Sequence, residues 1–206
     1  MKNGMKIIVT IIIAIIVILV LGIIANVIRN NIIMKKLYEN SSELKTSIKN
    51  YYYEKKSELS EGETRTTTYK IYNYNDKYLI KEYYNDEGNI TTEWIDKSIP
   101  EYISMNEETG EKNQEIKMKE FDKEYEEVLF STTIDKVGYG KILTANILTP
   151  IRTEDNCYVI NYDDTTFYIN KNTGTISRAF YGNGNVSCTY KLKNNSVIEN
   201  EVIKPE

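Results

Sequence analysis

The sequence predicts an α+β protein, with an N-terminal transmembrane helix followed by an antiparallel β-sheet and a few packed helices. Two observations predict this class. One apolar run near the N-terminus is long enough to span a bilayer, and the remaining sequence alternates short β-favouring segments with turn-forming residues. We divide the 206 residues into three segments: an N-terminal tail with the membrane anchor (1–29), a juxtamembrane amphipathic helix (30–58) and a β-rich extracytoplasmic domain (59–206).

The apolar run extends from Ile7 to Ile28 without a charged residue, and its polar side chains, Thr10 and Asn26, lie near its two ends. At about 1.5 Å rise per residue, a helix of this length spans a hydrocarbon core of roughly 30 Å. A cleaved signal peptide would have a shorter apolar region and an A-x-A-like site, which the residues around Ala25 do not provide. No cysteine directly follows the run, which also excludes lipoprotein processing at that point. We therefore expect an uncleaved, single-pass signal anchor in the cell membrane.

The charges beside the run leave its orientation open. Lys2 and Lys6 precede it, while Arg29, Lys35 and Lys36 follow it, so the positive-inside rule assigns neither direction. We place the soluble part outside the cytoplasm because only six residues precede the run and the C-terminal part is typical of an envelope domain.

Charge and composition exclude several classes of function. The chain carries a formal charge of −4 and its first 30 residues carry +3, which leaves −7 on residues 31–206. An acidic surface repels phosphate backbones, so we expect no nucleic-acid partner. Histidine, the commonest general base and metal ligand, is absent, and two cysteines alone cannot close a zinc site. Nucleotide-binding, nucleophile-elbow and zinc-protease motifs are also absent, so we predict no enzyme, cofactor or metal.

An apolar stripe follows the anchor and predicts an amphipathic helix that ends near Lys56, before Gly62. Its members recur at spacings of three, four or seven residues: Ile33, Leu37, Leu44, Ile48 and Tyr51 or Tyr52.

Two groups of β-favouring segments come next, separated by turn residues, and we predict that they form antiparallel meanders. Between the groups, residues 121–130 are typical of a helix, and a shorter helical piece is expected at 141–148, which Pro150 ends. The first group comprises residues 64–74, 77–84, 90–97, 100–106 and 113–119, and the second comprises 157–162, 165–171, 175–182 and 186–193.

The closing stretch NCYVINYDDTTFYINKNTGTISRAF, one further strand and the acidic end ENEVIKPE resemble the lipoprotein-carrier (LolA-like) half-barrel superfamily, as found in envelope proteins of Gram-positive bacteria. The resemblance covers roughly residues 40–206. Residues Tyr168–Gly174 are similar to the family's strand-to-hairpin pattern Y-I-D-K-x-T-G, with Asn170 where Asp is common. It implies a strongly curved, half-barrel-like sheet with helices over its concave side, where some relatives hold acyl chains. Typical carriers are released into the periplasm, whereas this chain is expected to be tethered.

Five residues are candidates for lining an apolar pocket, and the alternative is that they form the ordinary core between sheet and helices. They are Tyr69, Ile71, Trp94, Ile116 and Met118.

Cys157 and Cys188 would suit a disulfide in an extracytoplasmic domain. In a simple meander they lie three strands apart and at opposite strand ends, which exceeds the Cα separation of ~4.4–6.8 Å in a disulfide. The geometry argues against the bridge, which stays open as an alternative.

Adjacent carboxylates occur at 107–108, 126–127, 154–155 and 163–164. Consecutive strand residues point to opposite faces, so such neighbours do not form the facing pair that glycoside hydrolysis needs. We interpret Asp163-Asp164 as a tight turn.

Two functional hypotheses remain. The first is a membrane-tethered extracytoplasmic module that binds a lipid or another apolar envelope ligand. The alternative is a structural, assembly or partner-docking envelope protein, either pilin-like or associated with a sensor. Gly4 before the apolar run resembles a prepilin, although Val9 stands where the glutamate of a mature pilin is expected. The expected partners are the bilayer, through the N-terminal helix, and a lipid or protein of the envelope.

Overall fold

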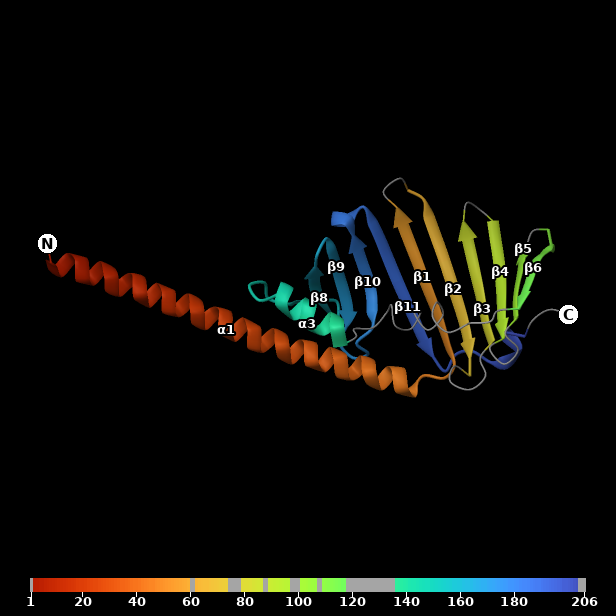
Figure 1. The fold of residues 1–206 in the computed structure, drawn as a ribbon, viewed down its shortest axis with the longest axis horizontal. Helices are drawn as coiled ribbons and strands as arrows, with labels where there is room; N and C mark the ends of the chain where they lie inside the picture. The colour runs from red at the N-terminus through yellow and green to blue at the C-terminus, as the bar shows by residue number, and fades with distance from the viewer. Residues whose placement is uncertain are drawn as a thin grey trace.

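The computed structural model describes residues 2–59, 62–73, 79–86, 89–96, 101–106, 109–117 and 136–203. Within these residues it shows a long helix, an antiparallel sheet and a second helix (Figure 1), which confirms the predicted α+β class. In chain order the elements are α1 (Lys2–Ser47), β1 (Tyr51–Leu59), β2 (Thr64–Tyr72), β3 (Leu79–Asp86), β4 (Asn89–Asp96), β5 (Glu101–Asn106), β6 (Lys112–Lys117), α3 (Lys136–Ala145), β7 (Arg152–Glu154), β8 (Cys157–Tyr162), β9 (Thr165–Asn170), β10 (Ile176–Tyr181), the 3₁₀ turn η1 (Gly182–Gly184), β11 (Val186–Asn194) and the 3₁₀ turn η2 (Glu199–Glu201).

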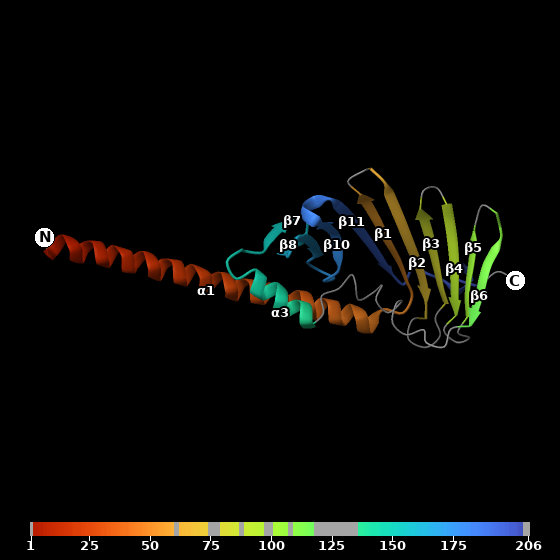
Figure 2. The same cartoon turned by 45° about the horizontal axis from the view of Figure 1, so that its top comes forward.

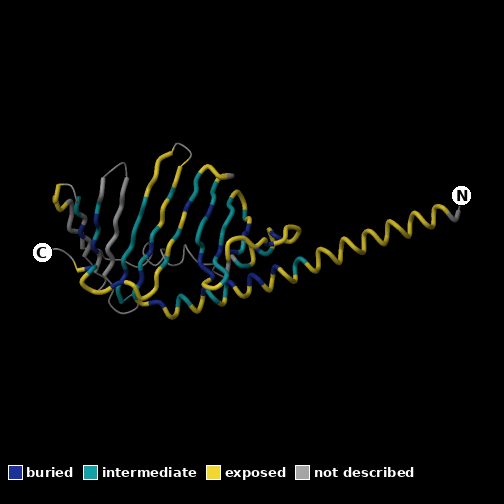
Figure 3. The backbone as a smooth tube through the Cα atoms, turned by 180° about the vertical axis from the view of Figure 1, so that it is seen from behind, coloured by how far each residue is buried: buried dark blue, intermediate teal, exposed yellow. Residues whose placement is uncertain are grey.

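Helix α1 is continuous but has two different surroundings. From Gly4 to Ala25 every residue is exposed, and this half projects away from the sheet (Figure 3). Among the described residues, α1 is the helix that is long and apolar enough to cross a membrane. Further along, a stripe of residues at helical spacing is buried against the domain: Asn30, Ile33, Met34, Leu37 and Ser41. One unbroken helix therefore joins a projecting apolar half to a docked half.

The described strands form one eleven-stranded sheet in the order β6-β5-β4-β3-β2-β1-β11-β10-β9-β8-β7. Two antiparallel meanders, β1 to β6 and β7 to β11, are joined where the first strand pairs with the last along nine residue pairs, from Tyr51 with Asn194 to Leu59 with Val186. Strands β6 and β7 lie at opposite edges (Figure 2), so the sheet stays open. An open, helix-covered antiparallel sheet is consistent with the expected half-barrel-like arrangement.

The predicted juxtamembrane helix of residues 30–58 is too long. The helix ends at Ser47, and Tyr51–Leu59 forms β1. Ile48 and Tyr51 fit a helical spacing, but Tyr51 and Tyr53 are buried while their neighbour Tyr52 is only half-buried, which is the alternation of a strand. Aromatic residues favour strands, and β1 is hydrogen-bonded on both sides, to β2 and to β11. The pairing with β11 is not visible in local residue spacing.

Most other predicted boundaries are close to the observed ones. Strand β8 has the predicted bounds, and β9, β10 and β11 differ from the prediction by one or two residues. The second helix begins earlier than predicted, at Lys136, and ends at Ala145. The short edge strand β7 was not predicted. The expected helix at 121–130 lies outside the described residues.

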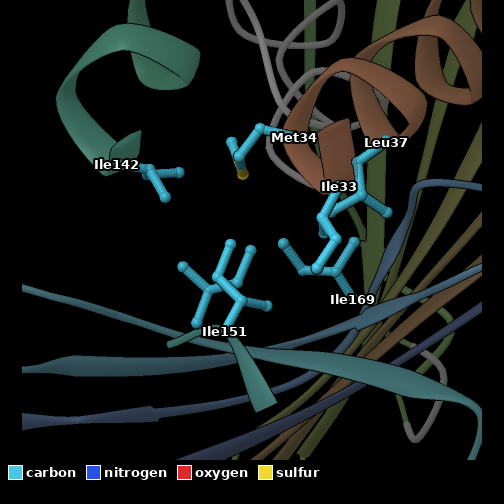
Figure 4. Close-up of a cluster of buried hydrophobic side chains, with 7 residues drawn as sticks. Ile33, Met34, Leu37, Ile142, Ile151 and Ile169 are labelled. Atoms are coloured by element: carbon cyan, nitrogen blue, oxygen red, sulfur yellow. The ribbon is translucent and has the colours of Figure 1, made fainter. Parts of the chain in front are cut away.

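Apolar side chains from both helices meet the sheet near β8 and β9. Figure 4 shows side chains of α1 and α3 pointing towards residues of the sheet and of the segment before β7. Both helices thus lie on the same face of the sheet, which we call the helix-facing side. The buried members of this cluster are Ile33, Met34, Leu37, Ile142, Ile151, Ile160 and Ile169.

Candidate functional site

An open groove of about 600 Å³ lies between α1 and the edge of the sheet at β7 and β8. It begins where the projecting half of α1 meets the domain. Thr153 and Tyr158 pair across β7 and β8, so they belong to the same side of the sheet. The volume falls in the range of roughly 300–1,000 Å³ that is usual for sites that bind small molecules. The described lining residues are Ala25, Ile28, Arg29, Ile32, Ile33, Thr153 and Tyr158.

The lining combines apolar surface with one charged group. Ile28 and Ile32 are 56% and 63% exposed, although both side chains are apolar. Among the described lining residues, Arg29 is the charged one, and its guanidinium is a strong partner for phosphate or carboxylate oxygens. The groove therefore suits a ligand that has an apolar chain and an anionic group.

The sheet wall of the groove is fixed by packing. Tyr158 lies against the buried cluster between helices and sheet. The Lys171 ammonium nitrogen lies 5.5 Å from the centre of the Tyr158 ring, a cation–π contact. Because the core and Lys171 both hold this ring, we expect the groove to keep its shape without a ligand.

The helix wall is positioned by two asparagines that bind the turn after α3. Asn26 Nδ2 donates a hydrogen bond to the Ile147 carbonyl at 2.7 Å, and Asn30 Nδ2 donates to the Asn146 carbonyl at 2.8 Å. Asn30 Oδ1 accepts from the Ile151 amide at 3.1 Å, and the Asn30 side chain is completely buried. These bonds set the position of α1 along the domain.

A second turn, between β9 and β10, binds α1 further along. Ser41 Oγ donates to the Gly174 carbonyl at 2.7 Å, and Asn40 Nδ2 donates to the Lys171 carbonyl at 3.0 Å. This turn closes the segment Tyr168–Gly174 on which the family resemblance rests. In this chain the segment contributes a docking turn for the helix.

A row of aromatic rings crosses five strands on the helix-facing side. The ring centres of Tyr69 and Tyr53 are 5.6 Å apart, and those of Tyr53 and Tyr190 are 6.3 Å apart. The hydroxyls of Tyr190 and Tyr181 are hydrogen-bonded at 2.8 Å, and the Phe167 ring lies 6.3 Å from that of Tyr181. Burial, together with this hydrogen bond, strongly raises the pKa of Tyr190. Burial also raises the pKa of Tyr181, so both hydroxyls are protonated at neutral pH.

The five residues predicted to line one pocket do not form a single group. Tyr69 and Ile71 lie on the helix-facing side of β2, and Ile116 occupies the same cross-strand row as Ile71. Trp94 precedes the β4 member of that row, so it lies on the opposite side of the sheet, where it is buried. Met118 lies outside the described residues. The pocket prediction is therefore wrong for Trp94, because the sequence did not reveal which residues of successive strands share a side.

The two cysteines are free and buried. Cys157 lies on β8 and Cys188 on β11, three strands away in the sheet, so the disulfide alternative is wrong and the meander geometry that argued against it is confirmed. Each sulfur lies 3.3 Å from a serine hydroxyl, Cys157 from Ser177 and Cys188 from Ser57.

Asp163 and Asp164 form the β8–β9 turn, as predicted. Both are exposed, and Asp163 has a φ of +48°, in the left-handed region that aspartate tolerates in turns.

Sequence reasoning missed the groove because its two walls are more than a hundred residues apart in the chain. In the sequence, Arg29 is recognisable only as a charge that flanks the apolar run. Asn26, a polar residue inside the apolar run, was the available signal that another segment contacts the helix there. No protein-family model matches the chain, and no curated protein is significantly similar to it.

Proposed function

We propose that this protein is a membrane-tethered, extracytoplasmic binding module whose groove beside α1 holds a lipid. The groove itself carries the proposal, since most of its lining is apolar, Arg29 is the charged residue among the described lining residues, and the groove begins beside the apolar half of α1. An acyl chain that enters from the bilayer along α1 would remain in contact with apolar surface, which avoids the cost of exposing it to water. Arg29 would then pair with the anionic headgroup.

The tether is α1. Its residues from Gly4 to Ala25 are exposed in the isolated chain, and most of them are large and apolar. A bilayer would remove this surface from water, whereas a soluble protein rarely exposes so large an apolar area. We further propose that the domain lies outside the cytoplasm, because the superfamily that it resembles is found in envelope proteins.

Membership of the LolA-like half-barrel superfamily is part of the proposal. The open antiparallel sheet with α1 and α3 on one side supports it. Because the chain is tethered, we propose that it holds or presents a lipid at the membrane and does not shuttle it through solution.

The test is native mass spectrometry of the full chain, released from membranes in a mild detergent. Ala25→Trp would fill the groove, while Ala14→Trp places the same ring on the projecting half of α1 as a matched control. We expect one bound lipid per chain in the parent and in Ala14→Trp, and its loss in Ala25→Trp. A parent chain without lipid, or equal retention in both variants, would contradict the proposal.

The assembly alternative is favoured by one observation, the unbroken helix that projects from the sheet. In this reading α1 packs with α1 of other copies. Peptide sequencing of the mature N-terminus separates the two, because cleavage after Gly4 would support pilin-like processing and an intact Met1 would exclude it.

A further inference from the structure

The turn between α3 and β7 exposes two large apolar side chains. Leu148 is 75% exposed and Ile147 is 39% exposed. In Figures 1 and 2 this turn is the part of the domain that extends furthest along α1 towards its projecting half. Single exposed apolar residues are ordinary on soluble proteins, so this exposure needs a second observation before it indicates a contact.

Asn26 provides that observation. It is a polar residue inside the apolar run, and an amide in hydrocarbon is costly unless its hydrogens are bonded. Asn26 Nδ2 donates to the Ile147 carbonyl at 2.7 Å and to the Asn146 carbonyl at 3.4 Å. The turn therefore supplies acceptors inside the segment of α1 that the sequence assigns to the bilayer. Asn26 lies three residues before Arg29, which is about 4.5 Å along the helix axis.

Asn30 holds the turn at this position along the axis of α1. Its buried amide donates to the carbonyls of Asn146 at 2.8 Å and Thr149 at 3.1 Å, and its oxygen accepts from the Ile151 amide at 3.1 Å. Three hydrogen bonds to one buried side chain bracket the exposed pair on both sides. Ile147 and Leu148 are thus held beside the membrane end of α1 and cannot swing away without breaking them.

We propose that this turn is a second membrane contact, in which Ile147 and Leu148 insert into the bilayer that α1 crosses. The inference rests on the membrane anchoring proposed above. The partner is the lipid surface because the two side chains continue the apolar surface of α1 at the same level along its axis. Interfacial elements bury their apolar side about 5–10 Å into the boundary between headgroups and acyl chains. If Arg29 lies among the phosphates, the turn bonded to Asn26 lies about 4.5 Å further towards the hydrocarbon, at this boundary.

Contact of both α1 and the turn after α3 with the bilayer would fix the orientation of the domain. A single helix lets a domain rotate about the helix axis, whereas a second insertion point beside it fixes which side of the domain faces the bilayer. The groove lies on the same stretch of α1, around Arg29, so this contact would keep its entrance at the level of the headgroups.

The test is depth-dependent fluorescence quenching in the full chain, reconstituted into phosphatidylcholine and phosphatidylglycerol vesicles with brominated acyl chains. Leu148→Cys carries a polarity-sensitive fluorophore. Ile15→Cys, within the apolar run, reports the anchor, and Glu63→Cys, beside the β1–β2 turn, reports an exposed position away from the membrane. The native Cys157 and Cys188 are buried, and the unsubstituted chain measures their background labelling.

We expect the label at position 148 to shift to the blue and to lose most of its emission, as at position 15, while position 63 stays unchanged. If position 15 is quenched but 148 behaves like 63, the second contact is overturned and the anchor stands. If position 15 is not quenched, the anchor fails and this inference with it. Equal quenching at all three positions would also overturn it, since the whole domain would then lie on the bilayer.

Discussion

Single polar side chains position α1 against the domain. Asn30 and Ser41 are buried on the docked half of the helix, and both bind backbone groups of turns that are distant in sequence. A hydrogen bond contributes about 0.5–1.5 kcal/mol, but leaving a buried partner unbonded costs about 1–3 kcal/mol. The apolar cluster alone would tolerate small sliding of the helix. The hydrogen bonds of Asn30 and Ser41 fix α1 at one position against the domain.

Gly174 is the residue at which a turn comes closest to α1. Its φ is +69°, and a Cβ added there would lie 2.5 Å from the Leu37 carbonyl oxygen and 2.6 Å from Ser41 Oγ. We expect Gly174→Ala to lower the free energy of unfolding by about 1–2 kcal/mol through its left-handed backbone and by a further ~1–3 kcal/mol through overpacking. Thermal unfolding of the full chain in detergent measures the loss.

Gly62→Ala is the matched control, because Gly62 also has a positive φ, +84°, but no atom lies within 4 Å of an added Cβ. It should show the backbone cost alone. Equal losses in the two variants would mean that the turn does not contact the helix this closely in solution.

Among the elements, β1 shows how far the sequence could predict this fold. The closing strands were predicted to within two residues because local alternation and turn residues such as Asp163, with its positive φ, define them. Strand β1 was mistaken for helix because Tyr51 continues the helical spacing of Ile48, while its true partners are residues 64–71 and 186–194. The same limit applies to the groove, whose walls are brought together only by the fold.

The row of aromatic rings links β2, β1, β11, β10 and β9 on the helix-facing side, and it predicts a pH dependence. Burial raises the pKa values of Tyr190 and Tyr181, so above about pH 10 the unfolded chain releases these protons before the folded chain does. The folded state is therefore unaffected below that pH and loses stability as the pH rises above it.

Tyr190→Phe removes one of these two groups. We expect the free energy of unfolding to fall by about 0.5–1.5 kcal/mol at pH 7, because the hydrogen bond to Tyr181 is lost. Between neutral and alkaline pH, however, the variant should lose less stability than the parent does. Thermal unfolding measured from pH 7 to 11 tests this. Phe167→Leu, which weakens ring packing without removing a hydroxyl, should lower stability and keep the parent's decline. An unchanged decline in Tyr190→Phe would show that this hydroxyl is not protected from water.

For the whole molecule, the arrangement of α1 determines what the domain can do. The docked half of the helix forms part of the core, and the projecting half is continuous with it, so the domain cannot move away from the end of the apolar run. The groove and the exposed turn after α3 both lie at that junction. If α1 crosses the bilayer as proposed, this domain meets its ligand at the membrane surface, on whichever side the domain lies.

That side can be determined with the cysteines. Because Cys157 and Cys188 are buried, the folded parent should react slowly with a membrane-impermeant maleimide. Glu63→Cys adds an exposed thiol on the domain, and Lys2→Cys adds one before the apolar run. With the domain outside the cytoplasm, we expect intact cells to label Glu63→Cys fully and Lys2→Cys only after permeabilisation. The reverse pattern would place the domain in the cytoplasm. The proposed extracytoplasmic location would then be wrong, and a lipid found in the groove would have to come from the cytoplasmic side of the membrane.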